Sequence, residues 1–173
     1  MGLAALLVSA PAKAFEREWH VGAGAGISGL TAEGVGSGLE AGAHLAYGLS
    51  DTFDVRLDGR YALLPVVLPA TALHLPVEES RSFAVVDASI AYKVDLLRLV
   101  PWLAVGVGYF HAFEAPLPEQ SLASHDLHLV GSFGLDYAVT RQLGLGVTAR
   151  SGYLLAGAGT FGAQGYAEYR WGF

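Results

Sequence analysis

The sequence predicts an all-β fold, an eight-stranded antiparallel transmembrane up-and-down β-barrel. Three observations predict it. Apolar and polar residues alternate in about eight segments, as in strands that have one apolar face. Glycine accounts for 23 of 173 residues, nearly double its usual share of about 7%, which disfavours helices. Hydrophobic residues make up 53% of the chain and charged residues only 15%, against about 25% charged residues in soluble domains.

No segment has the composition of a membrane-spanning helix. The longest stretches without Asp, Glu, Lys or Arg are 61–77, which contains three prolines, and 151–167, which is rich in glycine. A spanning helix needs about 20 predominantly apolar residues. Because a bilayer admits only helices and closed barrels, a chain of this composition that spans a membrane is expected to be a barrel.

We expect eight strands, each as long as the roughly 9–11 residues that a tilted spanning strand needs. They are expected at 17–28, 36–48, 52–64, 81–94, 101–112, 125–139, 143–154 and 160–173. The connections at 49–51, 95–100 and 140–142 are short, and those at 29–35, 65–80 and 113–124 are longer. Outer-membrane barrels have short periplasmic turns, so both chain ends are expected on the periplasmic side.

The third segment shows the alternation most clearly. Between Phe53 and Leu63 every odd position is apolar, while the even positions are Asp54, Arg56, Asp58, Arg60 and Ala62. A shift of one residue would turn four charged side chains toward lipid. Near the midplane this costs up to about 2–4 kcal/mol for each basic residue. The hydrocarbon therefore fixes the register of this strand.

Charged residues of the other strands also share the polar parity, which predicts a charged lumen. The expected network consists of Glu18, Glu40, Asp54, Arg56, Asp58, Arg60, Asp87, Lys93, Asp136, Arg150, Glu168 and Arg170. The interior of an eight-stranded barrel is just wide enough to be filled by side chains, and buried charges must be paired. We therefore expect a plugged lumen. Inward glycines such as Gly22, Gly106 and Gly144 leave a polar pore as the alternative.

Two charged residues and one strand depart from the pattern. Arg17 and Arg81 fall on the outward parity, at strand ends. In the strand at 81–94, Phe83 and Val85 share the parity of Asp87 and Lys93. We expect a bulge there, or a strand that protrudes above the membrane.

Aromatic residues are expected to form two girdles at the membrane interfaces. The periplasmic girdle would contain Trp19, Tyr47, Phe53, Tyr92, Trp102, Tyr137, Tyr169, Trp171 and Phe173. The outer girdle would contain Tyr61, Tyr109, Phe110, Tyr153 and Phe161.

Motifs for cofactors, metals and catalysis are weak. Residues 24–29 match G-x-G-x-x-G, but no helical pattern follows, as a dinucleotide site requires. Ser124, His125 and Asp126 are adjacent on a strand, so His125 faces away from the other two. The six histidines have no metal-ligand spacing, and there is no cysteine. We expect no cofactor, no metal site and no catalytic residue. The formal charge of −6 argues against a nucleic-acid partner.

The first 14 residues resemble a signal peptide rather than part of the barrel. An apolar stretch precedes Ala12, Lys13 and Ala14, which fit a small-x-small cleavage site. The usual positive segment at the start is missing, which leaves open that the signal is truncated. Residues 15–173 are then expected to form a single barrel domain.

Two motifs resemble those of the small outer-membrane barrels of the outer-membrane protein A and opacity-protein type. Residues 101–109, PWLAVGVGY, resemble their glycine-rich strand, with Ala104 in place of one usual glycine. Tyr169, Trp171 and Phe173 are similar to the C-terminal signal that the barrel-assembly machinery recognises. The resemblance implies a monomer in the bacterial outer membrane. Its partners would be outer-membrane lipid, lipopolysaccharide and the assembly machinery.

The expected function is a structural or surface-interaction role without catalysis. The alternative is a conduit for small apolar molecules, because the expected loop at 65–80 is unusually apolar. A lipid hydrolase with its catalytic residues at the outer rim is a third hypothesis.

Deletion of Phe173 should reduce assembly into the outer membrane and leave export unchanged, because the terminal aromatic belongs to the expected assembly signal. Membrane and periplasmic fractions of cells that express the full and the truncated chain would be compared by immunoblot. Equal membrane yields would contradict this assignment.

Overall fold

The chain forms one closed antiparallel β-barrel. The computed structural model describes residues 17–32, 34–68, 77–113 and 123–172. The strands are β1 (Trp19–Leu30), β2 (Ser37–Gly48), β3 (Phe53–Leu68), β4 (Val77–Lys93), β5 (Leu99–Ala112), β6 (His125–Ala138), β7 (Leu143–Leu154) and β8 (Gly159–Trp171). Each strand pairs with its neighbours in the chain, and β8 pairs with β1. The predicted fold class is confirmed. The described residues include no helix with the length and hydropathy to cross a bilayer.

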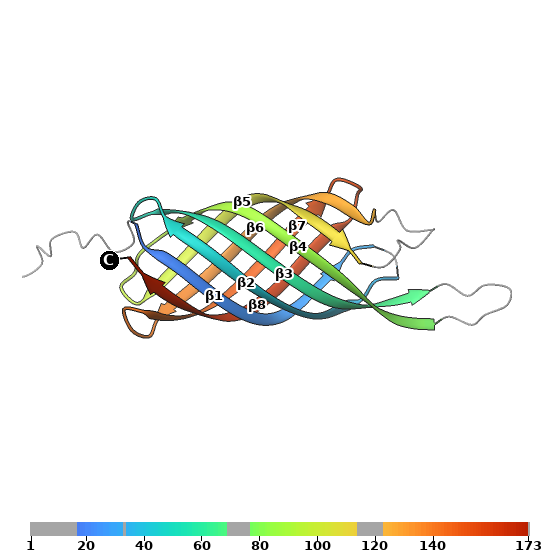
Figure 1. Ribbon diagram of the computed structural model, residues 1–173, viewed down its shortest axis with the longest axis horizontal. Helices are drawn as coiled ribbons and strands as arrows, with labels where there is room; N and C mark the ends of the chain where they lie inside the picture. Colours follow the sequence, from blue (N-terminus) through green and yellow to red (C-terminus); the bar gives the residue numbers. More distant parts are fainter. Residues whose placement is uncertain (1–16, 33, 69–76, 114–122, 173) are drawn as a thin grey trace, which may run out of the picture.

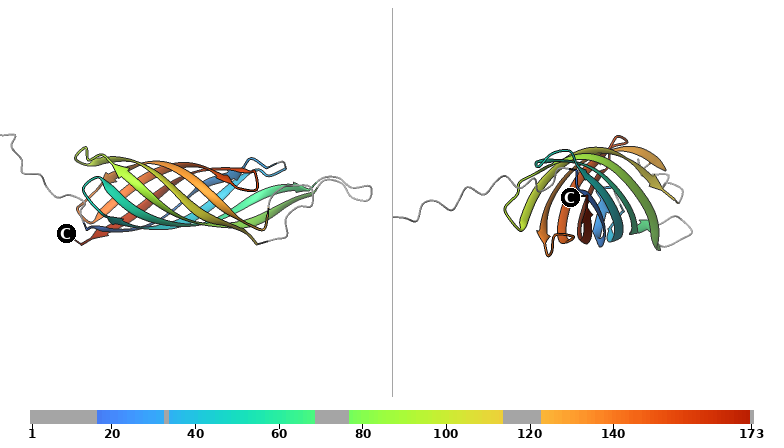
Figure 2. Two further views of the ribbon diagram at one scale, coloured as in Figure 1. Left: turned by 90° about the horizontal axis from the view of Figure 1, so that it is seen from above. Right: turned by 60° about the vertical axis from the view of Figure 1, so that its left-hand side comes forward.

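The strands are steeply tilted and the two ends of the barrel differ (Figures 1 and 2). The turns β2–β3, β4–β5 and β6–β7 lie at the same end as the C-terminus, which is the periplasmic end in the predicted topology. At the opposite end the β3–β4 hairpin reaches beyond the other strands. The expected signal peptide lies outside the described residues, and so do residues 69–76 and 114–122 of the longer loops.

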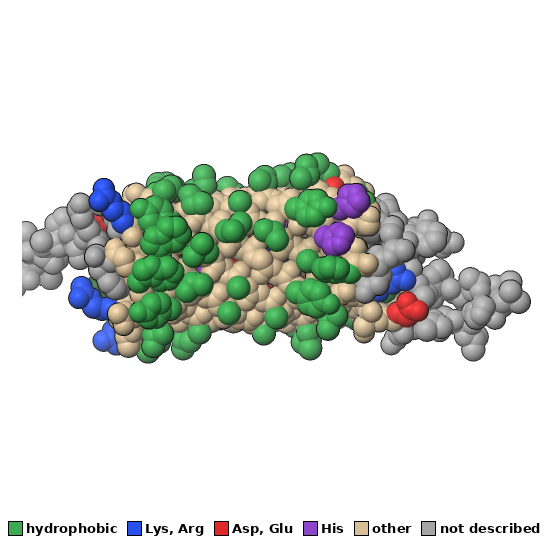
Figure 3. Space-filling model, in the orientation of Figure 1, with side chains coloured by type: hydrophobic (Ala, Val, Ile, Leu, Met, Phe, Trp, Pro, Cys, Tyr) green, Lys and Arg blue, Asp and Glu red, His purple; other side chains and the backbone are tan. Residues whose placement is uncertain are grey.

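The outer wall is apolar because one parity of every strand faces outward. In β5, Leu103, Val105 and Val107 are 59%, 73% and 60% exposed, as predicted. Hydrophobic side chains cover the barrel wall in Figure 3, and basic residues are seen only at its ends. Rings of exposed aromatic residues lie near both ends, and one is a row of neighbouring rings formed by Tyr47, Trp19, Trp171 and Tyr169. This wall matches the hydrocarbon of a bilayer.

The predicted loop at 65–80 is shorter than expected, because β3 continues to Leu68 and β4 begins at Val77. Pro65 lies within the sheet, opposite Ser80. Its carbonyl accepts a hydrogen bond from the Gly36 amide at 2.8 Å, and a residue in a strand directs its nitrogen to the same side as its carbonyl. The missing N–H of Pro65 therefore faces away from β4. Pro65 therefore does not end the strand, which was expected to stop at residue 64.

The first outer loop is attached to the part of β3 that lies beyond the end of β2. Val35 forms a bridge with Val66, and the Val67 amide donates to the Gly34 carbonyl at 2.8 Å. The connection between β7 and β8 is attached as well. The Ala156 amide donates to the Asp126 carboxylate at 2.6 Å, and the Gly159 amide donates to the Thr31 hydroxyl at 2.7 Å. Both outer connections are therefore fixed to the barrel wall.

Of the two alternatives expected for β4, the bulge is absent, whereas the strand does extend beyond the others at the outer end. The β3–β4 register is unbroken from Phe53 opposite Tyr92 to Leu68 opposite Val77. Phe83 is buried and Val85 packs beside it, so both face inward together with Asp87. Arg81 shares this inward parity, which corrects its predicted outward placement. Apolar and charged residues can share the inward parity of β4, because the outer part of the lumen is itself apolar.

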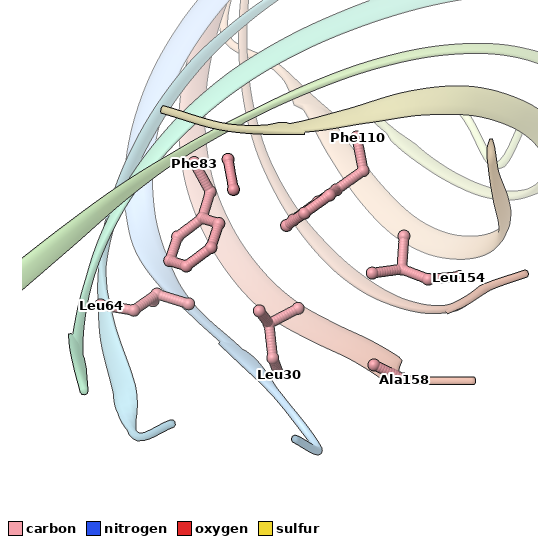
Figure 4. Close-up of a cluster of buried hydrophobic side chains, with 7 residues drawn as sticks. Leu30, Leu64, Phe83, Phe110, Leu154 and Ala158 are labelled. Atoms are coloured by element: carbon pink, nitrogen blue, oxygen red, sulfur yellow. The ribbon is translucent and has the colours of Figure 1, made fainter. Parts of the chain in front are cut away.

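An apolar cap, contributed by five strands and the β7–β8 turn, lies in this outer part of the lumen (Figure 4). The apolar cap consists of Leu30, Leu64, Phe83, Phe110, Ala112, Leu154 and Ala158. The rings of Phe83 and Phe110 lie 5.4 Å apart between centroids. Phe110 belongs to this cap and not to the predicted outer girdle.

Trp102 also faces the lumen, and not the predicted periplasmic girdle. Its exposure is 4%, because the outward parity of β5 is the odd one. Gly134 lies directly opposite on β6, and a Cβ atom added there would overlap the Trp102 ring. Other inward glycines face large side chains in the same way, such as Gly146 beside the Tyr166 ring. The space that these glycines leave is occupied by their neighbours.

Gly134→Ala should destabilise the barrel by about 1–3 kcal/mol, the usual cost of an extra methyl group in a filled interior. Gly165→Ala is the matched control, because a Cβ atom at Gly165 has nothing within 4 Å. We expect the control to change stability by less than about 0.5 kcal/mol. Urea unfolding in detergent micelles would measure both. Equal unfolding midpoints would show that Trp102 is loosely packed.

Candidate functional site

The barrel interior is the candidate site, because the predicted charged residues meet there. Ten of the twelve are buried, and only Asp58 and Arg60 are partly exposed. The buried ten are Glu18, Glu40, Asp54, Arg56, Asp87, Lys93, Asp136, Arg150, Glu168 and Arg170. Together they occupy the lumen from its periplasmic end to the apolar cap.

At the periplasmic end, Glu168 is the centre of a cluster of ionisable side chains. It lies 3.6 Å from His20 and 3.3 Å from His44, and it forms an ion pair with Arg170. His20 lies 3.4 Å from Glu18 as well. Three strands, β1, β2 and β8, contribute these side chains, so the cluster joins the strands that close the barrel.

A second ion pair, between Lys93 and Asp54, joins β4 to β3. The Lys93 Nζ atom lies 2.7 Å from the Asp54 carboxylate, and each side chain is only 2% exposed. Direct contact compensates part of the cost of removing both charges from water.

Arg56 lies in the middle of the lumen, above the face of Trp102. The guanidinium carbon is 4.2 Å from the Trp102 ring centroid, a distance typical of a cation–π contact. The indole N–H of Trp102 donates to Asp136 at 3.2 Å, and the Tyr166 hydroxyl donates to the same carboxylate. Trp102 was missed as a lumen residue, although the parity of β5 could have indicated it.

Nearer the apolar cap, Asp87 bonds to two partners from different strands. It forms an ion pair with Arg60, and its carboxylate lies 2.8 Å from His128 Nδ1. The other ring nitrogen of His128 lies 2.7 Å from the Thr160 hydroxyl. On the far side of the lumen, Arg150 lies 2.9 Å from Glu40 and also bonds to Gln164.

The chain Asp87–His128–Thr160 has the order of acid, base and hydroxyl found in hydrolases. His128 is only 1% exposed, and Thr160 is partly exposed. The same contacts satisfy a buried imidazole on both nitrogens, as buried polar groups require. We therefore interpret this arrangement as structural.

Two of the small cavities among the described residues lie within the lumen. One, of about 30 Å³, lies between the apolar cap and the polar side chains of Glu40, Arg60 and His128. The other, of about 10 Å³, is lined by Arg56, Trp102 and their neighbours. One water needs roughly 10–15 Å³ of such cavity volume. The larger cavity therefore has room for about two waters and the smaller one for about one.

The weak sequence motifs form no site. Residues 24–29 lie within β1 and precede no helix. Ser124 contacts His125 Nδ1 at 3.1 Å, but Asp126 bonds to the backbone amides of Leu127 and Ala156. Within the described ranges, no group of three or more His, Asp or Glu side chains is arranged to hold a metal.

Removal of one buried charge should be far more costly than removal of an exposed one. Lys93→Met leaves Asp54 buried beside an apolar chain and should destabilise by about 3–5 kcal/mol. Arg98→Met on the exposed β4–β5 turn is the control, with an expected effect below about 1 kcal/mol. Urea midpoints would be compared, and Lys93→Met with Asp54→Asn should recover much of the loss. A similar small effect of Lys93→Met and Arg98→Met would mean that water reaches Asp54.

Comparison with known proteins gives structural neighbours only. Family models and curated proteins do not match the chain. Neisserial surface protein A matches with a TM-score of 0.65 at 17% identity, over 87% of this chain and 96% of that chain. The outer-membrane protein OprG of Pseudomonas aeruginosa matches with a TM-score of 0.65 at 14% identity, over 92% and 98%. The attachment invasion locus protein Ail of Yersinia pestis matches with a TM-score of 0.59 at 13% identity, over 91% and 100%.

These identities are low, so the likeness concerns the fold. The neighbours are small outer-membrane barrels, in agreement with the resemblance and the outer-membrane localisation that the sequence predicts. The chain has the fold of the small eight-stranded β-barrels of the bacterial outer membrane.

Proposed function

We propose that this protein is a non-catalytic structural or surface-interaction protein of the outer membrane, with a lumen plugged by its own side chains. The observation that supports the proposal is the burial of large side chains inside the barrel. Charged side chains lie buried in the periplasmic and central lumen, the apolar cap lies in its outer part, and the two cavities described above have room for only a few waters.

Buried ion pairs between strands support the proposal of a plug. Lys93 and Asp54, and Arg150 and Glu40, are buried pairs that cross between strands. Moving one partner aside to admit a solute would leave the other charge unpaired, which costs about 3–5 kcal/mol. An ion would have to break several such pairs and then cross the apolar cap.

A surface role is supported by the outer end of the molecule. The β3–β4 hairpin extends beyond the barrel, and the first outer loop is attached to its β3 side. The neighbours include one protein named for its surface location and one named for attachment and invasion. We extend a surface role to this chain as part of the proposal.

The proposed partners are outer-membrane lipid, lipopolysaccharide and the barrel-assembly machinery, without nucleic acid. The apolar wall and the exposed rings of Tyr169 and Trp171 suit lipid and the expected assembly signal. Phe173, the last residue of that signal, lies outside the described residues. Since every described strand of the barrel pairs on both sides, no partner is needed to close the sheet, and we propose a monomer.

A conduit for small apolar molecules is the second candidate, and the apolar cap is the observation that favours it. The cap would suit an apolar solute at the outer mouth of the barrel. Below it, however, the polar side chains of Glu40, Arg60 and His128 line the lumen, and they disfavour an apolar solute. The third candidate, a lipid hydrolase, would depend on the Asp87–His128–Thr160 chain, in which Asp87 and His128 are buried, and on a route to it.

Conductance and uptake would separate the first two candidates. In planar bilayers, the refolded wild-type protein should give no conductance steps above the lipid background. Arg56→Ser with Trp102→Ser, which removes two large lumen side chains, should give steps and would show that the assay detects an opened barrel. Proteoliposomes should take up a small apolar dye at the rate of protein-free vesicles. Steps from the wild type, or faster dye uptake, would exclude the plug.

A further inference from the structure

We propose that His111 and His125 form a surface site for a divalent transition-metal ion at the outer rim of the barrel. The two residues lie 14 positions apart in the sequence and face each other across β5 and β6. Both are on the outward parity, where their neighbours are Tyr109 and Leu127. The proposal is independent of whether the lumen is plugged.

The strand pairing brings these two side chains into close proximity. The Ala112 amide donates to the Ser124 carbonyl at 2.8 Å, so Ala112 and Ser124 form a hydrogen-bonded pair. In an antiparallel ladder the next pair, His111 and His125, is then a non-hydrogen-bonded one. Such pairs have the shorter Cα separation, about 4.5 Å, and the closer side chains.

Histidine side chains are visible at the outer end of the wall in Figure 3. Among the described histidines, His20, His44 and His128 are buried, and only His111 and His125 reach the surface. Two ligand nitrogens at about 2.0–2.1 Å from one ion lie within about 4 Å of each other. Two histidines directly opposite each other on neighbouring strands can bring their nitrogens to this separation by side-chain rotation alone.

Neighbouring side chains orient both imidazoles. The Ser124 hydroxyl lies 3.1 Å from His125 Nδ1, where it can accept the Nδ1–H and leave the lone pair on Nε2. Metal-binding histidines usually have such a partner on the second nitrogen. His111 packs edge to face against Phe113, with 4.9 Å between ring centroids. The two rings are therefore partly ordered before any ion binds.

Imidazole nitrogens favour Cu²⁺, Zn²⁺ and Ni²⁺ over the alkaline-earth ions. Two protein ligands leave the remaining positions to water or to oxygen ligands from outside, so the site would be open and exchangeable. The pair lies just beyond Tyr109, one of the exposed outer aromatic residues, where water is available. The ion class follows from ligand type, and Cu²⁺ is the strongest binder of the series.

The test uses untagged, refolded protein in micelles. His74 lies outside the described residues, so His74→Ala is introduced into the reference protein and into every variant to remove it as a source of ligand nitrogen. Calorimetric titration with Cu²⁺ should show one site, and electron paramagnetic resonance should show two coordinated imidazole nitrogens. His111→Ala and His125→Ala should each abolish this two-nitrogen signal. Ser124→Ala should weaken binding by about tenfold or more, the usual effect of losing the partner of a ligand histidine.

A geometric control separates a pair site from two independent histidines. His125→Ala with Leu127→His keeps two outward histidines on β5 and β6 but moves them to diagonal positions, roughly 7–8 Å apart. This variant should lose the two-nitrogen signal and most of the affinity. Heat-dependent mobility on detergent gels would check that each variant folds. No Cu²⁺ binding by the wild type, or binding unchanged in either single variant or in the diagonal variant, would overturn the proposal.

Discussion

The structure depends on one constraint, that backbone N–H and C=O groups within a bilayer must find partners in the protein. The chain meets it by pairing β8 with β1, so that the sheet has no open edge within the wall. Continuous pairing sets the parity of each strand and therefore divides its side chains between lipid and lumen. The apolar wall and the charged interior are two consequences of the same ladder of hydrogen bonds.

The lumen has a polarity gradient along its axis. Charged groups from Glu168 to Asp87 lie in the periplasmic and central parts, and the apolar cap lies in the outer part. The charged and central part has glycine on neighbouring strands beside its large side chains, because an eight-stranded barrel leaves little interior space. Gly134 beside Trp102 shows this most directly. Small and large inward residues are therefore complementary, and the high glycine content of the chain has a packing function.

Much of this architecture could be predicted because alternation with a period of two is local information. The strand positions, the outward residues and the inward parity of the twelve charged residues all follow from it. The prediction failed where the environment of the lumen changes. Phe83 and Val85 suggested a bulge only because an inward position was assumed to be polar, and Trp102 and Phe110 were assigned to girdles against the parity of β5. Pro65 is tolerated because its nitrogen faces away from β4. Which side of β3 faces β4 at this position cannot be read from the local sequence.

The partners of side chains could not be predicted, because they depend on the register between strands that are distant in sequence. Asp87 and His128 are 41 positions apart and become neighbours only when the barrel closes. The same holds for His111 and His125, which the sequence shows only as two of six scattered histidines.

The attachment of the outer connections to the wall has a consequence for recognition. Val35 is bridged to Val66, and Ala156 is bonded to Asp126, so these segments already have a defined conformation in the free protein. Binding to a flexible loop loses about 0.5–1.5 kcal/mol for each side chain that becomes ordered. A ligand that contacts these two segments would avoid most of that entropic loss. Affinity at this end of the molecule would then depend mainly on shape complementarity.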